Sequence, residues 1–276
     1  MKSASILAVA ILAVLGCNKE DEHSPTGETQ LLGAISIALQ TLPSDVIQVR
    51  ARITRNGFAT QETQLSGTTS GFASVPIGVW KLRVTGLDTS GAAIYSDQED
   101  VDVQHLLVAL ATLDLVPFVT NGSFEIGPPV GTYLPLDSGS TAIQNWTVSR
   151  GQLDYVTVWS SYHGKRSLDM HGTPGIGGIR QTITTIKGKT YQVRFALAGN
   201  PEGSPAIKTL GISAGGPSSQ FIFDTTGRTF QNMGWTTVSW EFVALGTQTT
   251  LEFYSLSTTS TSYGPAIDNV SVAEID

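Results

Sequence analysis

Two acidic side chains lie in short motifs near the two ends of the second half of the chain. Glu125 follows the residues NGSF, and Asp268 lies in the motif AIDNVSV. Two carboxylates held close together repel by several kcal/mol at low dielectric, so burying both requires a cation. Calcium suits such a site because it takes about six to eight oxygen ligands in loose geometry. The chemistry of both acids therefore depends on whether the fold brings them together.

The elements that position these acids are expected to be β-strands. The chain has 276 residues, enough for two domains, and only 14% of them are charged. No amphipathic helical pattern occurs beyond the N-terminus, whereas β-branched runs alternate with Gly, Pro, Asn and Ser. The sequence thus predicts an all-β protein. The net charge of −7 and the absence of a basic cluster exclude a nucleic-acid-binding surface.

The first 17 residues are typical of a bacterial lipoprotein signal peptide. A lysine follows Met1, and the apolar run from Ile6 to Leu15 is too short to span a bilayer. Cys17, the only cysteine, follows Gly16 in an arrangement that resembles a lipobox, which implies cleavage before Cys17 and its lipidation. The alternative is a plain secretory signal with a chance cysteine.

Residues 18–28 form a polar segment that we expect to be a tether. Its acidic residues resemble the surface-export signals of some bacterial lipoproteins; the alternative is a hydrophilic spacer. Together with the lipobox, the tether predicts a lipid-anchored, extracytoplasmic protein of the bacterial cell envelope, at the outer membrane or the cell surface.

Residues 29–117 are expected to form a small β-sandwich. Residues 46–54 alternate apolar and polar side chains, and Asn56-Gly57 is a turn signal. A further strand carries Trp80 and Leu82 on one face. The pattern resembles small transthyretin-like or immunoglobulin-like domains, which implies a spacer or scaffold.

Residues 118–276 are expected to form a larger, two-sheet jelly roll, because short strands alternate with turns and no helical segment intervenes. The strands predicted from the pattern are Leu153–Trp159, Gly178–Ile186, Tyr191–Leu197, Thr209–Ser213, Thr236–Ala244, Thr249–Ser255 and Ala266–Val272.

Nine motifs occur in order along this second domain: NGSFE, NW, GQLDY, HGKRSLDMHG, GGIRQTI, GKTYQVRFALAGN, MGW, FVA and GPAIDNVSV. Together they resemble the DUF642 family and its bacterial "choice-of-anchor C" relatives. This resemblance implies a galactose-binding-like jelly roll, akin to many carbohydrate-binding modules. It covers all of residues 118–276 and none of the first domain.

The resemblance also implies a structural calcium site. In modules of this shape the first and last strands lie side by side, and a Glu and an Asp in these motifs share the ion with backbone carbonyls. Here the implied side-chain ligands are Glu125 and Asp268, and the candidate carbonyl ligands are those of Ser123, Gly164 and Ser167. The alternative is that Glu125 pairs with Lys165 or Arg166 and that Asp268 caps a turn.

Sugar-binding sites place aromatic rings against pyranose rings and use amides or carboxylates for the hydroxyl groups. In LDYVTVWSSYHG, Tyr155 and Trp159 share one face of the expected strand, and Tyr162 and His163 follow it. This face is the predicted ligand platform, with Asn200, Asp169 and His171 as polar candidates; the alternative is that it packs against another strand or against the first domain. Trp240 and Trp146 are expected to belong to the core.

Other chemistries lack support in the sequence. His163, Asp169 and His171 do not have a recognised zinc spacing. The glycines of HGTPGIGGI lead into a strand and not a helix, and no GxSxG motif is present, so we expect neither a nucleotide site nor catalytic residues.

The sequence therefore predicts a non-catalytic domain that binds polysaccharide or glycan, on a protein attached to the membrane through its lipid. Two alternatives stay open: a structural or adhesive envelope protein that binds a protein partner, and a hydrolase of cell-wall carbohydrate.

Overall fold

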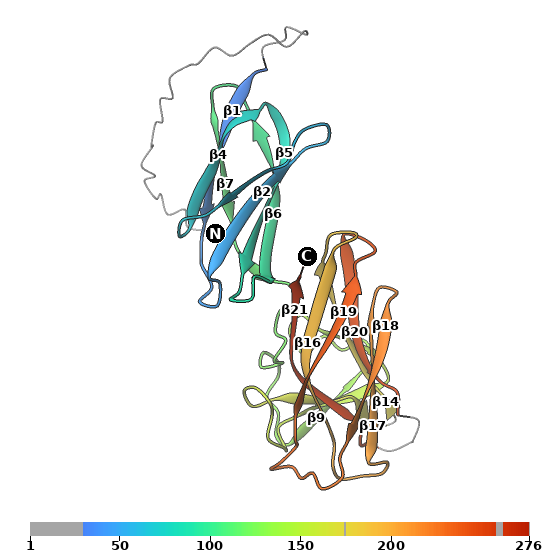
Figure 1. Ribbon diagram of the computed structural model, residues 1–276. Helices are drawn as coiled ribbons and strands as arrows, with labels where there is room; N and C mark the ends of the chain where they lie inside the picture. Colours follow the sequence, from blue (N-terminus) through green and yellow to red (C-terminus); the bar gives the residue numbers. More distant parts are fainter. Residues whose placement is uncertain (1–29, 174, 258–261, 276) are drawn as a thin grey trace. The chain divides into compact units, whose positions relative to one another are not determined.

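Every regular element that the structure describes is a β-strand (Figure 1). The computed structural model describes residues 30–173, 175–257 and 262–275, so Cys17 and the predicted signal and tether lie outside the described residues. The all-β class predicted from the sequence is confirmed. In this part of the chain no helix is long and apolar enough to cross a bilayer.

Among the strands of residues 32–117, β4-β1-β7 form one sheet and β3-β2-β5-β6 form part of a second, and β8 pairs with β6. That second sheet continues beyond residue 117, because Ala93 of β6 pairs with Glu274 of β21 (Pro265–Glu274). Strand β1 pairs antiparallel with β4 and parallel with β7. Alternation of side chains along β2 buries Val49, Ala51 and Ile53, as the sequence pattern predicts. The strand bounds are β1 Leu32–Leu39, β2 Gln48–Thr54, β3 Gln61–Gln64, β4 Thr69–Pro76, β5 Gly78–Leu87, β6 Ala93–Val103, β7 Val108–Leu113 and β8 Val116–Pro117.

The strands of residues 133–274 form two larger sheets and a short β13-β14 pair. One sheet has the order β10-β15-β20-β17-β18; in the other, β16 lies between β19 and β21, and β12, β11 and β9 continue beyond β21. All neighbours in these two sheets are antiparallel. The bounds are β9 Tyr133–Asp137, β10 Thr147–Arg150, β11 Gln152–Val156, β12 Ser167–Asp169, β13 His171–Gly172, β14 Gly175–Ile176, β15 Gly178–Thr184, β16 Thr190–Gly199, β17 Ile207–Ala214, β18 Ser218–Asp224, β19 Thr236–Val243, β20 Gln248–Ser255 and β21 Pro265–Glu274.

The buried apolar side chains form two separate clusters. One draws on residues between Ile35 and Leu115, and the other on residues between Phe118 and Val272. The domain boundary expected at residues 117 and 118 stays a prediction. Trp80 is fully buried in the first cluster, and Trp146 is 1% exposed in the second.

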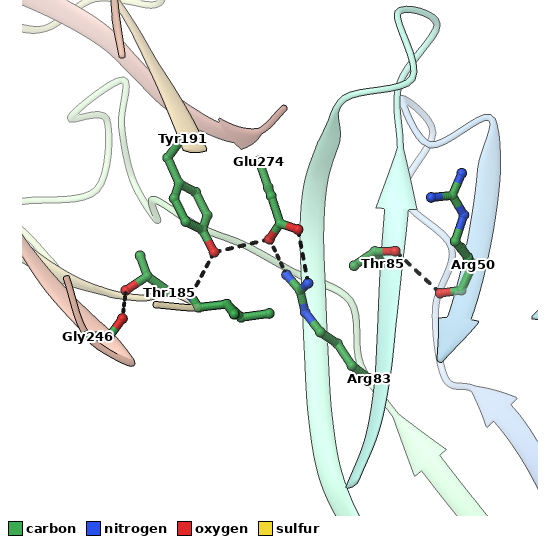
Figure 2. Close-up of polar contacts among 8 residues, drawn as sticks. Arg50, Arg83, Thr85, Thr185, Tyr191, Gly246 and Glu274 are labelled. Atoms are coloured by element: carbon green, nitrogen blue, oxygen red, sulfur yellow. Dashed lines mark hydrogen bonds and ion pairs between the residues drawn. The ribbon is translucent and has the colours of Figure 1, made fainter. Parts of the chain in front are cut away.

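Glu274 at the end of β21 is the centre of a polar network (Figure 2). It accepts a hydrogen bond from the Tyr191 hydroxyl at 3.1 Å and forms a bidentate ion pair with Arg83, whose nearest N–O distance is 2.7 Å. The Tyr191 oxygen also accepts the backbone amide of Ile186. Burial, reinforced by the neighbouring carboxylate, raises the pKa of Tyr191, so this hydroxyl stays protonated and donates to Glu274.

Candidate functional site

The NGSFE motif forms a tight turn that is fixed by its own asparagine. Asn121 has a left-handed backbone with φ 52°, a conformation that Asn tolerates better than most residues. Its Nδ2 donates to the carbonyls of Ile126 and Gln144, both at 2.9 Å, and its Oδ1 accepts the Ile126 amide at 3.0 Å. These bonds fix the direction in which the chain leaves the turn, and therefore the position of Glu125.

The same turn is held against β21 by its glycine. The Gly122 carbonyl accepts the Val270 amide at 2.8 Å, and a Cβ at position 122 would overlap the Val270 carbonyl oxygen. Phe124, also left-handed at φ 58°, is fully buried and packs on Trp146. The motif therefore brings Glu125 to the part of β21 that carries Asp268.

Glu125 and Asp268 contact one short loop, residues 163–166. The Asp268 Oδ2 accepts the His163 amide at 2.8 Å. The Glu125 Oε1 accepts the amides of Lys165 and Arg166 at 2.9 and 2.8 Å. Gly164 lies between these donors, has φ 66°, and has no room for a Cβ because the Glu125 carboxyl group occupies that space. Both acids that the sequence singled out thus accept hydrogen bonds from backbone amides of the same loop.

Asp268 is a buried carboxyl group. It is 0% exposed, and burial raises its pKa to about 6. Hydrogen bonds from the amides of His163 and Asn269 lower the pKa and so offset part of the effect of burial. A neighbouring cation would offset the cost of ionising this group at neutral pH.

The cationic neighbours of Glu125 contact it through their backbones. Lys165 and Arg166 donate their amides to its carboxylate, whereas the Arg166 guanidinium donates to the Glu125 carbonyl at 2.8 Å. The same Nη1 donates to the Tyr155 hydroxyl at 2.9 Å, and Tyr155 in turn donates to the Phe124 carbonyl. The side-chain ion pair between Glu125 and these residues that the sequence left open is therefore not formed.

Of the other three predicted metal ligands, Gly164 lies in this loop, Ser167 directly follows it, and Ser123 lies two residues before Glu125. Ser123 is half-buried. The Gly164 carbonyl accepts the Ser161 hydroxyl at 2.8 Å, and the buried Ser167 hydroxyl accepts the Trp159 indole N–H at 2.7 Å. Within the described ranges, no three His, Cys, Asp or Glu side chains cluster as a metal site would require. An ion here would therefore take the two carboxylates and complete its shell with carbonyl or water oxygens, a donor set that fits calcium.

The predicted aromatic platform is wrong for Tyr155 and Trp159. Tyr155 is 0% exposed and Trp159 is 5% exposed, and both belong to the core of the second cluster. The expected strand from Leu153 to Trp159 ends at Val156 in the structure, so the alternation that placed both rings on an outer face does not continue. Strand β11 also lies between β9 and β12, which makes it an interior strand.

Asn200 is also wrong as a ligand-binding residue. Its side chain is 8% exposed, and its Nδ2 donates to Asp169 Oδ2 at 2.9 Å. Asp169 is 1% exposed and also accepts the amides of His171 and Gly264. Burial, together with the nearby carboxylate of Asp154 on the neighbouring strand, raises the pKa of Asp169 to about 7, although the hydrogen bond from Asn200 acts in the opposite direction. These residues fix the loops at this end of the sandwich from inside.

Tyr162 and His163 are exposed, as the sequence predicted. Tyr162 is 46% exposed and meets Trp235 edge to face, with ring centroids 6.5 Å apart. The Trp235 indole donates to the Ser160 carbonyl at 2.8 Å, and the hydroxyls of Tyr162 and Thr237 lie 3.2 Å apart. This surface, the Tyr162–Trp235 pair, offers one accessible ring and no coplanar platform. Trp240, expected in the core, is half-buried and stacks on Phe242.

A second surface was not anticipated from the sequence: the outer face of the β10-β15-β20-β17-β18 sheet. One row of residues crosses all five strands in register, and we call it the Tyr254 row: Arg150, Gly178, Tyr254, Gly211 and Gln220. With strands about 4.8 Å apart, the row is on the order of 20 Å long. It is long enough to contact several units of an extended ligand.

The two glycines let large side chains lie flat along this row. A Cβ at Gly211 would overlap the Tyr254 ring, and a Cβ at Gly178 would crowd the stem of Arg150. The Arg150 guanidinium carbon lies 4.1 Å from the centroid of the Tyr254 ring, a cation–π contact. The guanidinium therefore lies over the Tyr254 ring, the ring packs against Gly211, and Gln220 is exposed at the far end of the row.

Charged and hydroxyl side chains border the row. Glu252 accepts the Ser149 hydroxyl at 2.6 Å and pairs with Arg150 at 2.7 Å. Arg180 lies opposite Glu252 on β15 and is exposed, so this part of the face carries two guanidinium groups for one carboxylate. The sequence held a signal for this surface: in LEFYS and TLGIS, alternation places Tyr254 and Gly211 outward, and an outward glycine in a strand marks a close approach.

The chain is related to known proteins over its second part. Residues 117–273 match the family model described as "Protein of unknown function (DUF642)". The chain belongs to the DUF642 family. Its DUF642 region contains the NGSFE turn, the loop of residues 163–166 and the Tyr254 row.

A curated relative of the chain is halomucin from Haloquadratum walsbyi. The two are 32% identical over 163 residues, which are 56% of this chain and 2% of halomucin. The chain thus spans a very small part of that relative's length.

Solved structures that resemble the chain have low sequence identity to it. A family 35 carbohydrate-binding module from Clostridium thermocellum is 17% identical, with 50% of this chain and 97% of the module covered and a TM-score of 0.35. TmCBM61 in complex with β-1,4-galactotriose is 12% identical, with 57% and 98% covered and a TM-score of 0.37. A family 16 carbohydrate-binding module is 14% identical, with 57% and 99% covered and a TM-score of 0.37.

Proposed function

We propose that the DUF642 region binds an extended glycan, without catalysis, on the outer face of the β10-β15-β20-β17-β18 sheet. The observation that carries this proposal is the Tyr254 row, in which the tyrosine ring packs against Gly211 and the guanidinium of Arg150 lies over the ring. Flat rings and guanidinium planes suit the apolar faces of sugar rings, and Gln220 and Glu252 offer partners to the hydroxyl groups.

The chemistry of the face favours a sugar over a protein partner. Its side chains are mainly hydroxyl, amide and charged groups, including Thr182, Thr250 and Ser213, and its large exposed aliphatic residues are Ile207 and Ile222. Protein interfaces need a desolvated apolar centre, which this polar face does not provide.

A hydrolase is disfavoured by the position of the paired acids. Asp154 and Asp169 face each other on β11 and β12, and burial raises the pKa of both, as a general acid requires. Asp169, however, is 1% exposed and is hydrogen-bonded by Asn200 and two backbone amides. A carboxyl group in that position does not reach a substrate.

The test is a glycan array on the non-acylated chain from residue 18, followed by titration of the strongest glycan into two variants. We expect Tyr254→Ala to weaken binding about tenfold or more, because it removes the ring from the row. Tyr162→Ala, a matched loss of an exposed tyrosine, is expected to leave the affinity unchanged.

Three outcomes contradict this proposal. Loss of binding in Tyr162→Ala alone moves the site to the Tyr162–Trp235 pair. If both variants bind the glycan with the affinity of the parent, neither the Tyr254 row nor the Tyr162–Trp235 pair is the binding site. No glycan bound by the parent chain, with capture of an envelope protein instead, supports the adhesive alternative.

We propose further that calcium bridges Glu125 and Asp268 and stabilises the fold. The proposal is supported by the buried Asp268, by the shared loop of residues 163–166, and by nearby carbonyls such as that of Gly164. In this role the ion would join the first turn of the DUF642 region to its last strand.

This proposal predicts that calcium raises the melting temperature and that chelator lowers it. Asp268→Ala is expected to lower the melting temperature by removing hydrogen bonds from two amides, and also to abolish the difference between calcium and chelator. Asp224→Ala, at an exposed aspartate of β18, serves as the control. A parent chain that melts identically in calcium and in chelator would refute the site.

The location of the protein completes the proposal. We place it in the bacterial cell envelope, outside the cytoplasm, anchored by lipid on Cys17 and extended by the tether of residues 18–28. In this position many weak glycan contacts on one surface act together, because neighbouring copies raise the effective concentration. Labelling of the protein with radioactive palmitate, and loss of the label in Cys17→Ser, tests the anchor.

A further inference from the structure

A cluster of exposed aliphatic side chains lies at one end of the sandwich of residues 32–117. We call it the leucine tip: Leu106, Leu107, Val108 and Leu110, which are 82%, 55%, 59% and 75% exposed. Four large apolar residues within five positions form a contiguous patch, whereas single exposed apolar residues are ordinary on a protein surface.

The leucine tip is a defined structure and not a loose loop end. The Leu107 amide donates to the Gln104 carbonyl at 3.3 Å, which closes a turn, and the Leu107 carbonyl accepts the Ala34 amide at 3.0 Å. Leu106, at the most exposed position, has a left-handed backbone with φ 58°. Leucine rarely adopts this conformation, so the turn holds an apolar side chain out to solvent at a cost in strain.

The patch continues from the turn along β7. Strand β7 pairs in parallel with β1, so both strands start at this end of the sandwich (Figure 1). Val108 and Leu110 alternate with Ala109 and Ala111 and face outward, next to Ala34 and Ser36 of β1. The turn and the first residues of β7 thus form one apolar surface.

The position of the leucine tip along the chain indicates its occupant. The Leu106 amide donates to the Leu32 carbonyl at 3.0 Å, so the tip lies where β1 begins. Fourteen residues, 18–31, separate Leu32 from Cys17. That length spans at most about 50 Å when fully extended and roughly 20 Å as a flexible coil. Lipid on Cys17 would therefore hold the tip close to the bilayer.

The size of the patch disfavours a second copy of the chain as the occupant. A stable protein interface uses about 20–30 residues on each side, with polar groups around an apolar centre. The leucine tip has four apolar side chains, of which two lie at a narrow turn. A small protruding apolar surface fits the boundary between lipid headgroups and acyl chains, which needs no shaped partner.

We propose that the leucine tip inserts into the surface of the lipid bilayer and adds a second membrane contact to the anchor at Cys17. The proposal rests on the proposed anchor for its geometry, and its test does not use the anchor. A lipid chain together with an apolar protein contact gives firmer attachment than either alone. The insertion would also fix which end of this sandwich faces the membrane.

The test uses the non-acylated chain from residue 18 and phosphatidylcholine vesicles, with sedimentation of bound protein over a range of lipid concentrations. We expect measurable partitioning that persists in high salt. Leu106→Ser combined with Leu107→Ser is expected to lower the partition coefficient at least tenfold, since burying one leucine contributes about that factor. Leu245→Ser removes a side chain that is 62% exposed between β19 and β20, and is expected to leave the partition coefficient unchanged.

Two measurements keep the result decisive. An unchanged melting temperature shows that the double variant is folded, which we expect because both side chains are exposed. Light scattering detects self-association: a dimer of the parent chain that the double variant abolishes would assign the tip to a second copy and overturn the proposal. Absence of partitioning by the parent, or equal partitioning by the double variant, overturns it as well. The palmitate label reports on the anchor independently.

Discussion

Single residues decide where the acids of the DUF642 region lie. The Asn121 side chain makes two hydrogen bonds within its own turn and one to Gln144, and Gly122 permits the contact with Val270 that sets the turn on β21. Glu125 and Asp268 could be chosen from the sequence because each follows or occupies a recognisable motif. Their use of one loop could not, since it depends on the backbone amides of His163 and Arg166, whose directions no side-chain pattern encodes.

Buried carboxyl groups predict an unusual dependence of stability on pH. Burial raises the pKa of Asp169 from 3.8 to about 7, so the folded state favours its protonated form. Its contribution to stability is complete below pH 4 and is lost as the pH rises through 7. Asp154 and Asp268, with pKa values raised to about 6, act in the same direction.

The expected result is a melting temperature, measured in chelator, that falls as the pH rises from 4 to 8. Asp169→Asn keeps the side-chain shape without the ionisation and is expected to flatten this profile. The loss of unfolding free energy between pH 4 and 8 should shrink by on the order of a few kcal/mol. Asp224→Asn is the matched control, because hydrogen bonds from Thr226 lower the pKa of Asp224 and so act opposite to the shift at Asp169. A profile of Asp169→Asn that parallels the parent would contradict the assignment.

At the scale of elements, side-chain alternation located most strands of the second domain, and it failed where strands are short. Strands β15, β17 and β20 lie where the pattern predicts them. The predicted strand from Leu153 to Trp159 ends three residues early at Val156, and the chain then turns inward, which buries Trp159 against Ser167 and Phe230. Because the alternation does not continue past Val156, the predicted aromatic platform was misplaced.

The glycine in β17 gives a prediction at this scale. Gly211→Val should push the Tyr254 ring away from the sheet, because a side chain at 211 occupies the space of the ring. We expect at least a several-fold loss of glycan affinity with a cooperative unfolding transition retained. Gly131→Val, where a Cβ meets nothing within 4 Å, is the control and should bind normally. Undiminished binding by Gly211→Val would show that the flat ring is unnecessary.

For the whole molecule, composition and periodicity predicted the all-β class, and two buried clusters follow on either side of the expected boundary. The nine ordered motifs led to the DUF642 family, which the match over residues 117–273 shows. Alternation in the sequence indicates that Tyr254 and Gly211 face outward, but it could not assemble the proposed binding surface, because the Tyr254 row combines residues from five strands that only the sheet registers bring together.

The most direct test of the account is a map of backbone amide resonances during titration with the strongest glycan from the array. The account predicts that the perturbed amides gather in β10, β15, β20, β17 and β18, centred on Tyr254 and Gly211, with Arg150 and Gln220 at the ends. Perturbations confined to the loop of residues 157–166 and to Trp235, with the sheet unaffected, would contradict it.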